Sequence, residues 1–93
     1  MTNLQELMRH PQATFVDVRS PGEFQSGHVK NALNIPLDEI QERAEEIRSL
    51  KGPVFCYCRS GARSAMAVQL LNRMQVPEVY NAGGIDSLIS FMF

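Results

Sequence analysis

The chain has 93 residues, of which 44% are hydrophobic and 20% charged, and its formal net charge is -1. This length suits one small domain, residues 1–93, and the near-neutral charge gives no general attraction to nucleic acid or to anionic membranes. No apolar run approaches the roughly 18 residues of a transmembrane helix, and the N-terminus lacks the basic and apolar regions of a signal peptide, so we expect a cytoplasmic protein.

The first predicted elements are a short helix and a strand. Asn3 and Glu6 have the spacing of a capping box, and the helix that they begin ends near Pro11. Residues 15–18 form an apolar run rich in valine, which predicts a strand. A turn-rich crossover with one helical turn follows over residues 19–28, where Pro and Gly punctuate the chain.

Asp17 interrupts this first strand, and a buried carboxylate needs hydrogen-bond partners. One interpretation makes it a general base. The other, which we expect, makes it a structural acceptor for loop N–H groups or for the guanidinium of Arg19 or Arg63.

The middle of the chain predicts a strand and a longer helix. Residues 32–35 form a short apolar run that Pro36 closes. A helix is predicted from about residue 38 to residue 50, where Asp38 and Gln41 resemble a capping box. The acidic and basic residues of this segment alternate around the helix, which is typical of a solvated face and not of a metal site.

A third strand, a tight loop and another helix follow. The apolar run from Val54 is typical of a strand covered on both faces, and helical spacing of apolar residues predicts a helix from Arg63 or Ser64. Between them the loop begins with Cys58. Backbone N–H groups in such a loop, beside a helix N-terminus, can converge on an anion, and an anionic sulfur on Cys58 would lie at the centre.

The chain closes with a strand at residues 79–81, a turn at Gly83 and Gly84, and a last helix. The residues expected on the buried side of that helix are Ile85, Leu88, Ile89 and Met92. Strands that alternate with helices predict an α/β domain with a parallel sheet. Ligands of such sheets bind beyond the C-terminal ends of the strands, which is where Cys58 lies.

The two cysteines differ in their surroundings. Cys58 has Arg59 and Arg63 within five residues and a helix start beside it, which are conditions that stabilise a thiolate. Cys56 lies inside the apolar run, and we interpret it as a core residue. The pair lacks the C-x-x-C spacing of redox motifs, and the cysteines and histidines show no zinc-ligand spacing. We therefore expect neither a metal nor a cofactor.

Three motifs resemble the rhodanese (sulfurtransferase) family. The segment Cys58-Arg59-Ser60-Gly61-Ala62-Arg63-Ser64 is similar to its active-site loop. The segments Val16-Asp17-Val18-Arg19 through Asn34-Ile35-Pro36 and Asn81-Ala82-Gly83-Gly84-Ile85 resemble its N-terminal and C-terminal signatures. Together they span about residues 15–88, and small single-domain thiosulfate sulfurtransferases of bacterial type are the most similar group.

The resemblance implies a three-layer α/β domain, with a parallel sheet of four or five strands and the strands from Phe15 and Val54 at its centre. It implies that Cys58 takes sulfur from a small anionic donor such as thiosulfate and forms a persulfide. The sulfur then passes to cyanide or to a thiol acceptor, and a thioredoxin-like protein is one candidate for that acceptor. The substrate-binding residues implied are Arg59, Ser60, Gly61, Ala62 and Arg63. Loop support is assigned to Asp17, Arg19 and Ser64.

Two residues keep alternative roles. Arg63 either attracts the donor or braces the loop by pairing with Asp17 or Glu23. Ser64 either donates a hydrogen bond within the loop or caps the helix.

Two other functions compete with sulfur transfer. Cysteine phosphatases resemble C-x5-R, whereas Cys58 and Arg63 form C-x4-R, a tighter cradle suited to a single sulfur. A rhodanese-like binding module without catalysis is the other alternative, and the retained Cys58 argues against it. The chain also departs from the family, because Asp86-Ser87-Leu88 stand where a tryptophan often follows the glycine pair.

Overall fold

Four parallel strands form the centre of the fold in the computed structural model, which describes residues 3–92. They are β1 (Thr14–Asp17), β2 (Leu33–Asn34), β3 (Val54–Cys58) and β4 (Val79–Gly84). Their order is β2-β1-β3-β4, so the two predicted central strands are confirmed. Within the described residues no fifth strand joins this sheet.

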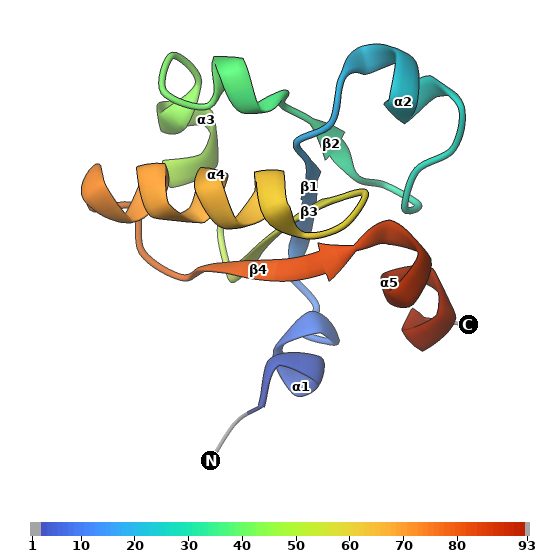
Figure 1. Cartoon of the computed structure of the whole chain (residues 1–93). Coiled ribbons are helices and arrows are strands. Elements are labelled where there is room, and N and C mark those ends of the chain that lie inside the picture. Colours follow the sequence, from blue (N-terminus) through green and yellow to red (C-terminus); the bar gives the residue numbers. More distant parts are fainter. Residues whose placement is uncertain (1–2, 93) are drawn as a thin grey trace.

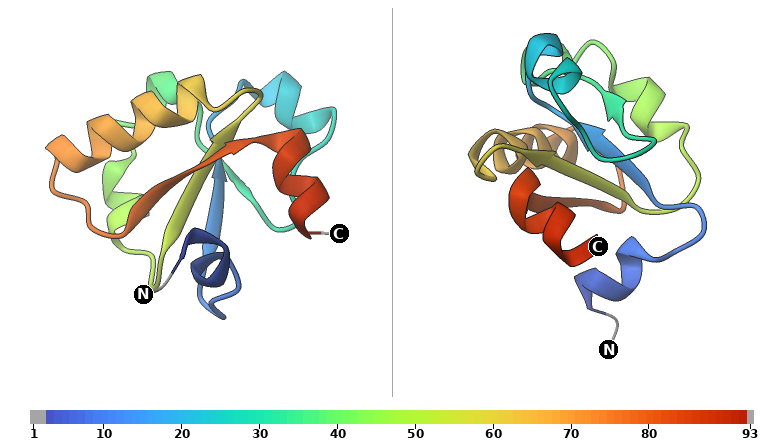
Figure 2. Two further views of the ribbon diagram at one scale, coloured as in Figure 1. Left: turned by 60° about the horizontal axis from the view of Figure 1, so that its bottom comes forward. Right: turned by 90° about the vertical axis from the view of Figure 1, so that its right-hand side faces the viewer.

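Helices cover both faces of the sheet, so the predicted three-layer arrangement is confirmed (Figure 2). They are α1 (Leu4–Met8), α2 (Pro21–Gln25), the 3-10 helix η1 (Leu37–Glu39), α3 (Ala44–Arg48), α4 (Ala62–Arg73) and α5 (Ile85–Met92). Side chains alternate across each strand. One face of β3 therefore packs beneath α3 and α4, and the other packs against α5 and α1.

The predicted helix over residues 38–50 is wrong as one continuous element. The chain forms η1, then turns, and only then forms α3. Tertiary contacts override the helical pattern, because Arg43 leaves helical geometry at φ -106° and ψ 15° and its guanidinium contacts Glu39 and the carbonyl of Asn34 at the end of β2. The segment still directs buried residues into the core, namely Ile40 just after η1 and Ile47 in α3.

The C-terminal part differs from the prediction at two points. Gly83 and Gly84 lie within β4, and not in a turn after it. A register shift between Cys56 and Tyr57 lets the longer β4 stay paired with β3 to its end. In α5, Leu88 is buried as expected, whereas Ile89 and Met92 are 37% and 39% exposed.

Parts of two predictions fall outside the described residues: Met1 and Thr2 of the N-terminal segment, and Phe93 of the apolar C-terminus. Within residues 3–92, none of the helices has both the length and the apolar character that crossing a bilayer requires.

Candidate active site

Cys58 is the last residue of β3, and a three-residue loop leads from it into α4. The loop is tight because Gly61, the N-cap of α4, has a left-handed φ of +99° that favours glycine. The neighbouring strand β4 approaches the loop closely. A Cβ atom at Gly84 would lie 2.6 Å from the carbonyl oxygen of Arg59, so only glycine fits there without a shift of backbone.

The Cys58 sulfur is surrounded by hydrogen-bond donors. The Gly61 amide donates to Sγ at 3.0 Å, and the Ser64 hydroxyl lies 3.6 Å from Sγ. Burial opposes ionisation of this thiol, but hydrogen bonds from the hydroxyl and amide of Ser64 and from the amides of Gly61 and Ser60 lower its pKa to about 7. About half of the thiol is therefore ionised near neutral pH.

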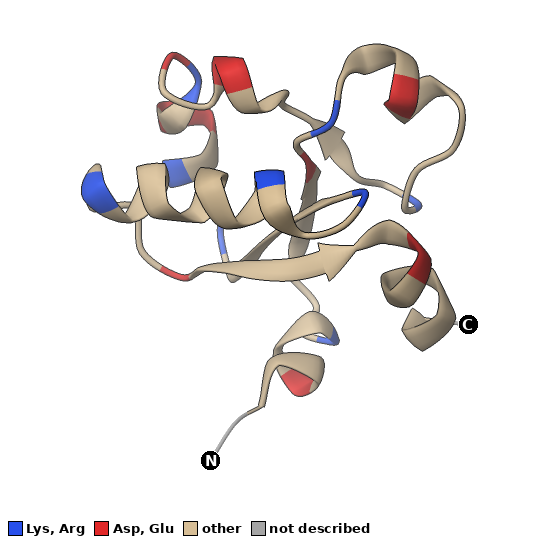
Figure 3. Cartoon of the chain, viewed as in Figure 1, with Lys and Arg blue, Asp and Glu red and all other residues tan. Residues whose placement is uncertain are grey.

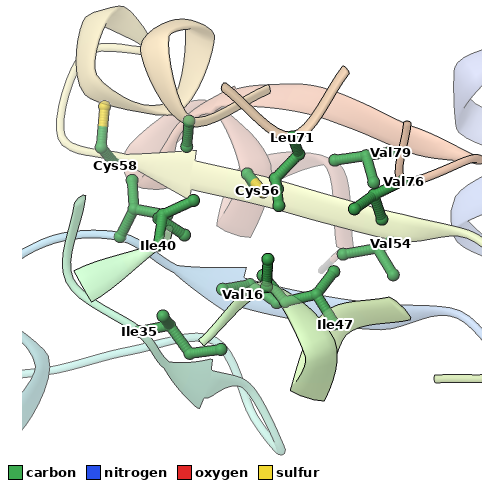
Figure 4. Close-up of a cluster of buried hydrophobic side chains, with 13 residues drawn as sticks. Val16, Ile35, Ile40, Ile47, Val54, Cys56, Cys58, Leu71, Val76 and Val79 are labelled. Carbon is green, nitrogen blue, oxygen red and sulfur yellow. The ribbon is translucent and has the colours of Figure 1, made fainter. Parts of the chain in front are cut away.

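Cys56 has a different environment on the same strand. It is completely buried in the cluster between the sheet and α3 and α4, where Leu71 lies close to it (Figure 4). In the same view, the sulfur of Cys58 lies at the end of the cluster and points toward the beginning of α4. Burial raises the pKa of the Cys56 thiol to about 12, so it stays protonated and unreactive near neutral pH.

Ser64 lies in the first turn of α4 and does not cap the helix. Its buried hydroxyl is 2.7 Å from Oδ1 of Asn81 in β4 and 3.1 Å from the Gly61 carbonyl oxygen. Of its two predicted roles, the structure shows the hydrogen bonds within the loop. Asn81 was not singled out by the sequence reasoning, and the only signal for it was its place in the C-terminal motif.

Arg63 pairs with Glu23 across the site. Its two terminal nitrogens lie 2.8 and 3.0 Å from the Glu23 carboxylate oxygens. Figure 3 shows the acidic position on α2 and the basic position at the start of α4. A hydrogen bond from Arg63, with others from Ser20, lowers the pKa of Glu23 to about 2. The geometry thus shows the bracing contact for Arg63.

The pairing depends on α2, whose start the sequence could have located. Ser20 accepts from the Glu23 amide and the Glu23 carboxylate accepts from the Ser20 amide, which is a capping box. The S-x-x-E spacing, with Pro21 at the first helical position, was an available signal for this helix.

Arg59 and Ser60 are exposed at the tip of the loop. Within residues 3–92, the guanidinium of Arg59 forms no ion pair, in contrast to that of Arg63. Its charge is therefore exposed and unpaired among the described residues, whereas the charge of Arg63 is matched by Glu23.

Asp17 and Arg19 form a buried ion pair beside the site. Nε and Nη2 of Arg19 lie 2.9 and 2.7 Å from the Asp17 carboxylate, and Arg19 Nη2 also donates to the Gly27 carbonyl at 2.7 Å. The hydroxyl of Tyr57 accepts from the Val29 amide at 3.0 Å. These contacts fix the 20–29 crossover to the sheet, and Asp17 has the expected structural partner.

A cavity of about 530 Å³ opens next to Arg63. It lies between the start of α2 and η1, and its walls include Val18, Pro21, Leu37 and Asp38. Among the described residues no group of His, Cys, Asp and Glu side chains is arranged to hold a metal ion.

Comparison with known proteins was made on sequence and on structure. The Rhodanese-like domain family matches residues 1–90. "Uncharacterized protein YqhL" of Bacillus subtilis is 44% identical over 73 residues, which cover 78% of this chain and 57% of YqhL. Thiosulfate sulfurtransferase PspE of Escherichia coli is 39% identical over 75 residues, which cover 80% of this chain and 72% of PspE. A solved structure, a rhodanese with anions from E. coli, matches with a TM-score of 0.72 at 39% sequence identity. The match covers 80% of this chain and 88% of the rhodanese chain.

Proposed function

This chain belongs to the rhodanese-like domain family, and we propose that it is a sulfurtransferase that carries sulfur as a persulfide on Cys58. The observation that carries this proposal is the sulfur of Cys58, which receives hydrogen bonds from the loop and has a pKa of about 7. A thiolate in that range is abundant at neutral pH and remains a good nucleophile.

The proposed reaction has two steps. The Cys58 thiolate attacks the outer sulfur of thiosulfate or a similar donor, the donor's S–S bond breaks, and sulfite leaves with the bonding electron pair. The thiolate of an acceptor, or cyanide, then attacks the outer sulfur of the persulfide, and Cys58 leaves as a thiolate. The amides of Ser60, Gly61 and Ser64, which already face Sγ, support the negative charge in both steps.

We assign the attraction of the anionic donor to Arg59 and the bracing of the loop to Arg63. Arg59 is exposed, whereas the charge of Arg63 is matched by Glu23. Ser60, Gly61 and Ala62 complete the binding loop through their backbone.

The proposal extends to the setting of the reaction. We propose that residues 1–93 form one rhodanese-like domain in the cytoplasm, and that thiols, a thioredoxin-like protein among them, are its acceptors. The two free cysteines support a reducing compartment.

Replacement of each cysteine tests the proposal. Cys58→Ser should abolish sulfur transfer from thiosulfate to cyanide, whereas the matched control Cys56→Ala should retain it in proportion to the folded fraction. After incubation with thiosulfate, mass spectrometry should find one added sulfur on the Cys58 side chain, removable by a reductant. Substantial turnover by Cys58→Ser, or the added sulfur on Cys56, would overturn the proposal. A reactive Cys58 that accepts sulfur from no donor would favour the binding module.

A further inference from the structure

The hydroxyl group of Ser64 has more acceptors around it than it has hydrogens. Its Oγ lies 2.7 Å from Asn81 Oδ1, 3.1 Å from the Gly61 carbonyl oxygen and 3.6 Å from Cys58 Sγ. A serine hydroxyl donates one hydrogen and accepts through two lone pairs. The hydrogen can therefore point to Asn81, to the Gly61 carbonyl oxygen or to the sulfur, but not to Asn81 and the sulfur together.

The orientation of the Asn81 amide is fixed by two backbone groups. The Gly83 amide donates to Oδ1 at 2.9 Å, so the atom at that position must be the oxygen. Nδ2 donates to the Gly61 carbonyl at 3.2 Å, so the atom on that side must be the nitrogen. Asn81 consequently presents an acceptor to Ser64, at the shortest of the three distances.

We propose that Asn81 is a positioning residue that accepts the Ser64 hydroxyl hydrogen whenever the Cys58 sulfur is protonated or carries a second sulfur, and releases it when that sulfur is a thiolate. In the first state Ser64 donates to Asn81 and its lone pair can accept from the Cys58 S–H group. In the second state the hydroxyl turns and donates to the anionic sulfur. No proton leaves Ser64 in either state, because only the direction of the O–H bond changes.

This hydrogen-bond switch rests on the proposed function and deepens it. Asn81 stabilises the uncharged sulfur, so it opposes the amides that favour the thiolate. The nucleophilicity of a thiolate falls as its pKa falls, and the best attacking thiol has a pKa near the ambient pH. Asn81 therefore keeps the pKa of Cys58 from falling below the useful range, and Ser64 still supports the thiolate when it leaves in the second step.

The charged groups near Cys58 act on either state from fixed positions. Arg63, from α4, is close enough to interact with the charge on the sulfur. The charge of Arg63 is itself matched by Glu23 from α2. Arg59 lies exposed in the loop, and Asp17 of β1 is paired with Arg19. None of these charged groups forms a hydrogen bond with the side chain of Ser64 or Asn81. Asn81 also contacts the Gly61 carbonyl and the Gly83 amide, so the Ser64→Ala background is needed to separate its effect on the hydroxyl from its effect on the loop.

Titration of the Cys58 thiolate by its ultraviolet absorbance tests the inference, and Cys56 does not interfere because its pKa is about 12. Asn81→Ala should lower the pKa of Cys58 by about half a unit to one unit, the effect of one net hydrogen bond on the protonated state. The same substitution in a Ser64→Ala background should leave that pKa unchanged, because the switch is then absent. If Asn81 only supports the loop, Asn81→Ala should raise the pKa of Cys58 both in the original chain and in the Ser64→Ala background, because the loop amides would no longer be held near the sulfur. A rise or no change in Asn81→Ala would overturn the inference.

A second variant decides the question if Asn81→Ala does not fold. Asn81→Asp keeps an acceptor for Ser64 and adds a negative charge, and it loses the Nδ2 donor to the Gly61 carbonyl in both backgrounds. It should raise the pKa of Cys58, and by a smaller amount in the Ser64→Ala background. An equal rise in both backgrounds would contradict the switch. Because the titration requires no sulfur donor, the result is independent of turnover. If the variants show the predicted pKa changes but the original chain transfers no sulfur, the proposed function is wrong and the hydrogen-bond switch still stands.

Discussion

Arg19→Met tests whether the Asp17 carboxylate is a structural acceptor. Methionine is an unbranched, apolar side chain that retains much of the aliphatic stem of arginine. The substitution removes the guanidinium that lies beside Asp17. The carboxylate would lose its contacts with Nε and Nη2 and keep the Arg19 backbone amide, 2.9 Å from Oδ1, and a hydrogen bond from the Tyr57 hydroxyl. Asp17 is completely buried, so water cannot replace the lost donors without opening the structure.

The expected effect is large for a domain of this size. A loss of about 3–5 kcal/mol, the usual cost of breaking a buried ion pair, corresponds to a fall in Tm of at least about 12 °C. The whole domain is expected to have only about 5–15 kcal/mol of stability. Arg19→Met should therefore be close to unfolding at physiological temperature.

Thermal and urea unfolding followed by circular dichroism would measure the loss. Glu45→Gln is the matched control, because Glu45 also pairs with an arginine, Arg48, but its side chain is 82% exposed. Its Tm should change by a few degrees at most, since exposed ion pairs contribute little. The double variant Asp17→Asn with Arg19→Met should recover part of the lost stability, because no buried charge is then left unpaired.

Two results would refute the structural role of Asp17. One is an Arg19→Met protein with the Tm of the original chain. The other is an Asp17→Asn protein that unfolds normally but has lost sulfur transfer a hundredfold or more, on the order of what removal of a general base costs. Activity that falls only with the folded fraction would agree with the contacts seen here.

The remaining predictions concern the loop. Ser64→Ala should raise the pKa of Cys58 above about 7, since a donor to the thiolate is lost, and a thiolate titration with an unchanged midpoint would show that the amides alone set it. Arg59→Ala should raise the KM for thiosulfate more than the KM for an uncharged persulfide donor, and equal effects would contradict its role in attracting the anion. Glu23→Gln and Arg63→Gln should lower Tm by similar amounts, with little further loss in the double variant; additive losses would mean that the two residues act separately. The pKa of Glu23 is depressed from 4.5 to about 2, so the contribution of this pair is fully present above pH 4.5 and is lost as the pH falls toward 2, which unfolding at several pH values would check.

Local sequence patterns were sufficient for the sheet and for the position of Cys58 at the end of a buried strand. The apolar run of β3 and the alternation of strands and helices predicted a parallel α/β sheet, because such strands are covered on both faces. Cys56 and Cys58 were separated by the same reasoning, since one lies within the apolar run and the other at its end. The helix start after Cys58 was predicted within two residues of Ala62.

The tertiary structure decided the partners of each polar side chain. From the sequence, Arg63 could either attract an anion or pair with Asp17 or Glu23. Its pairing with Glu23 depends on the position of α2, because Glu23 lies 40 residues earlier in the chain. The same holds for Asn81, which is 17 residues from Ser64 and meets it only because β4 runs beside the loop. The break between η1 and α3 also follows from a contact with β2. Hydrophobic periodicity indicates which face of an element is buried, although it placed Ile89 and Met92 of α5 wrongly. Hydrogen bonds between distant residues depend on how those elements are placed in space.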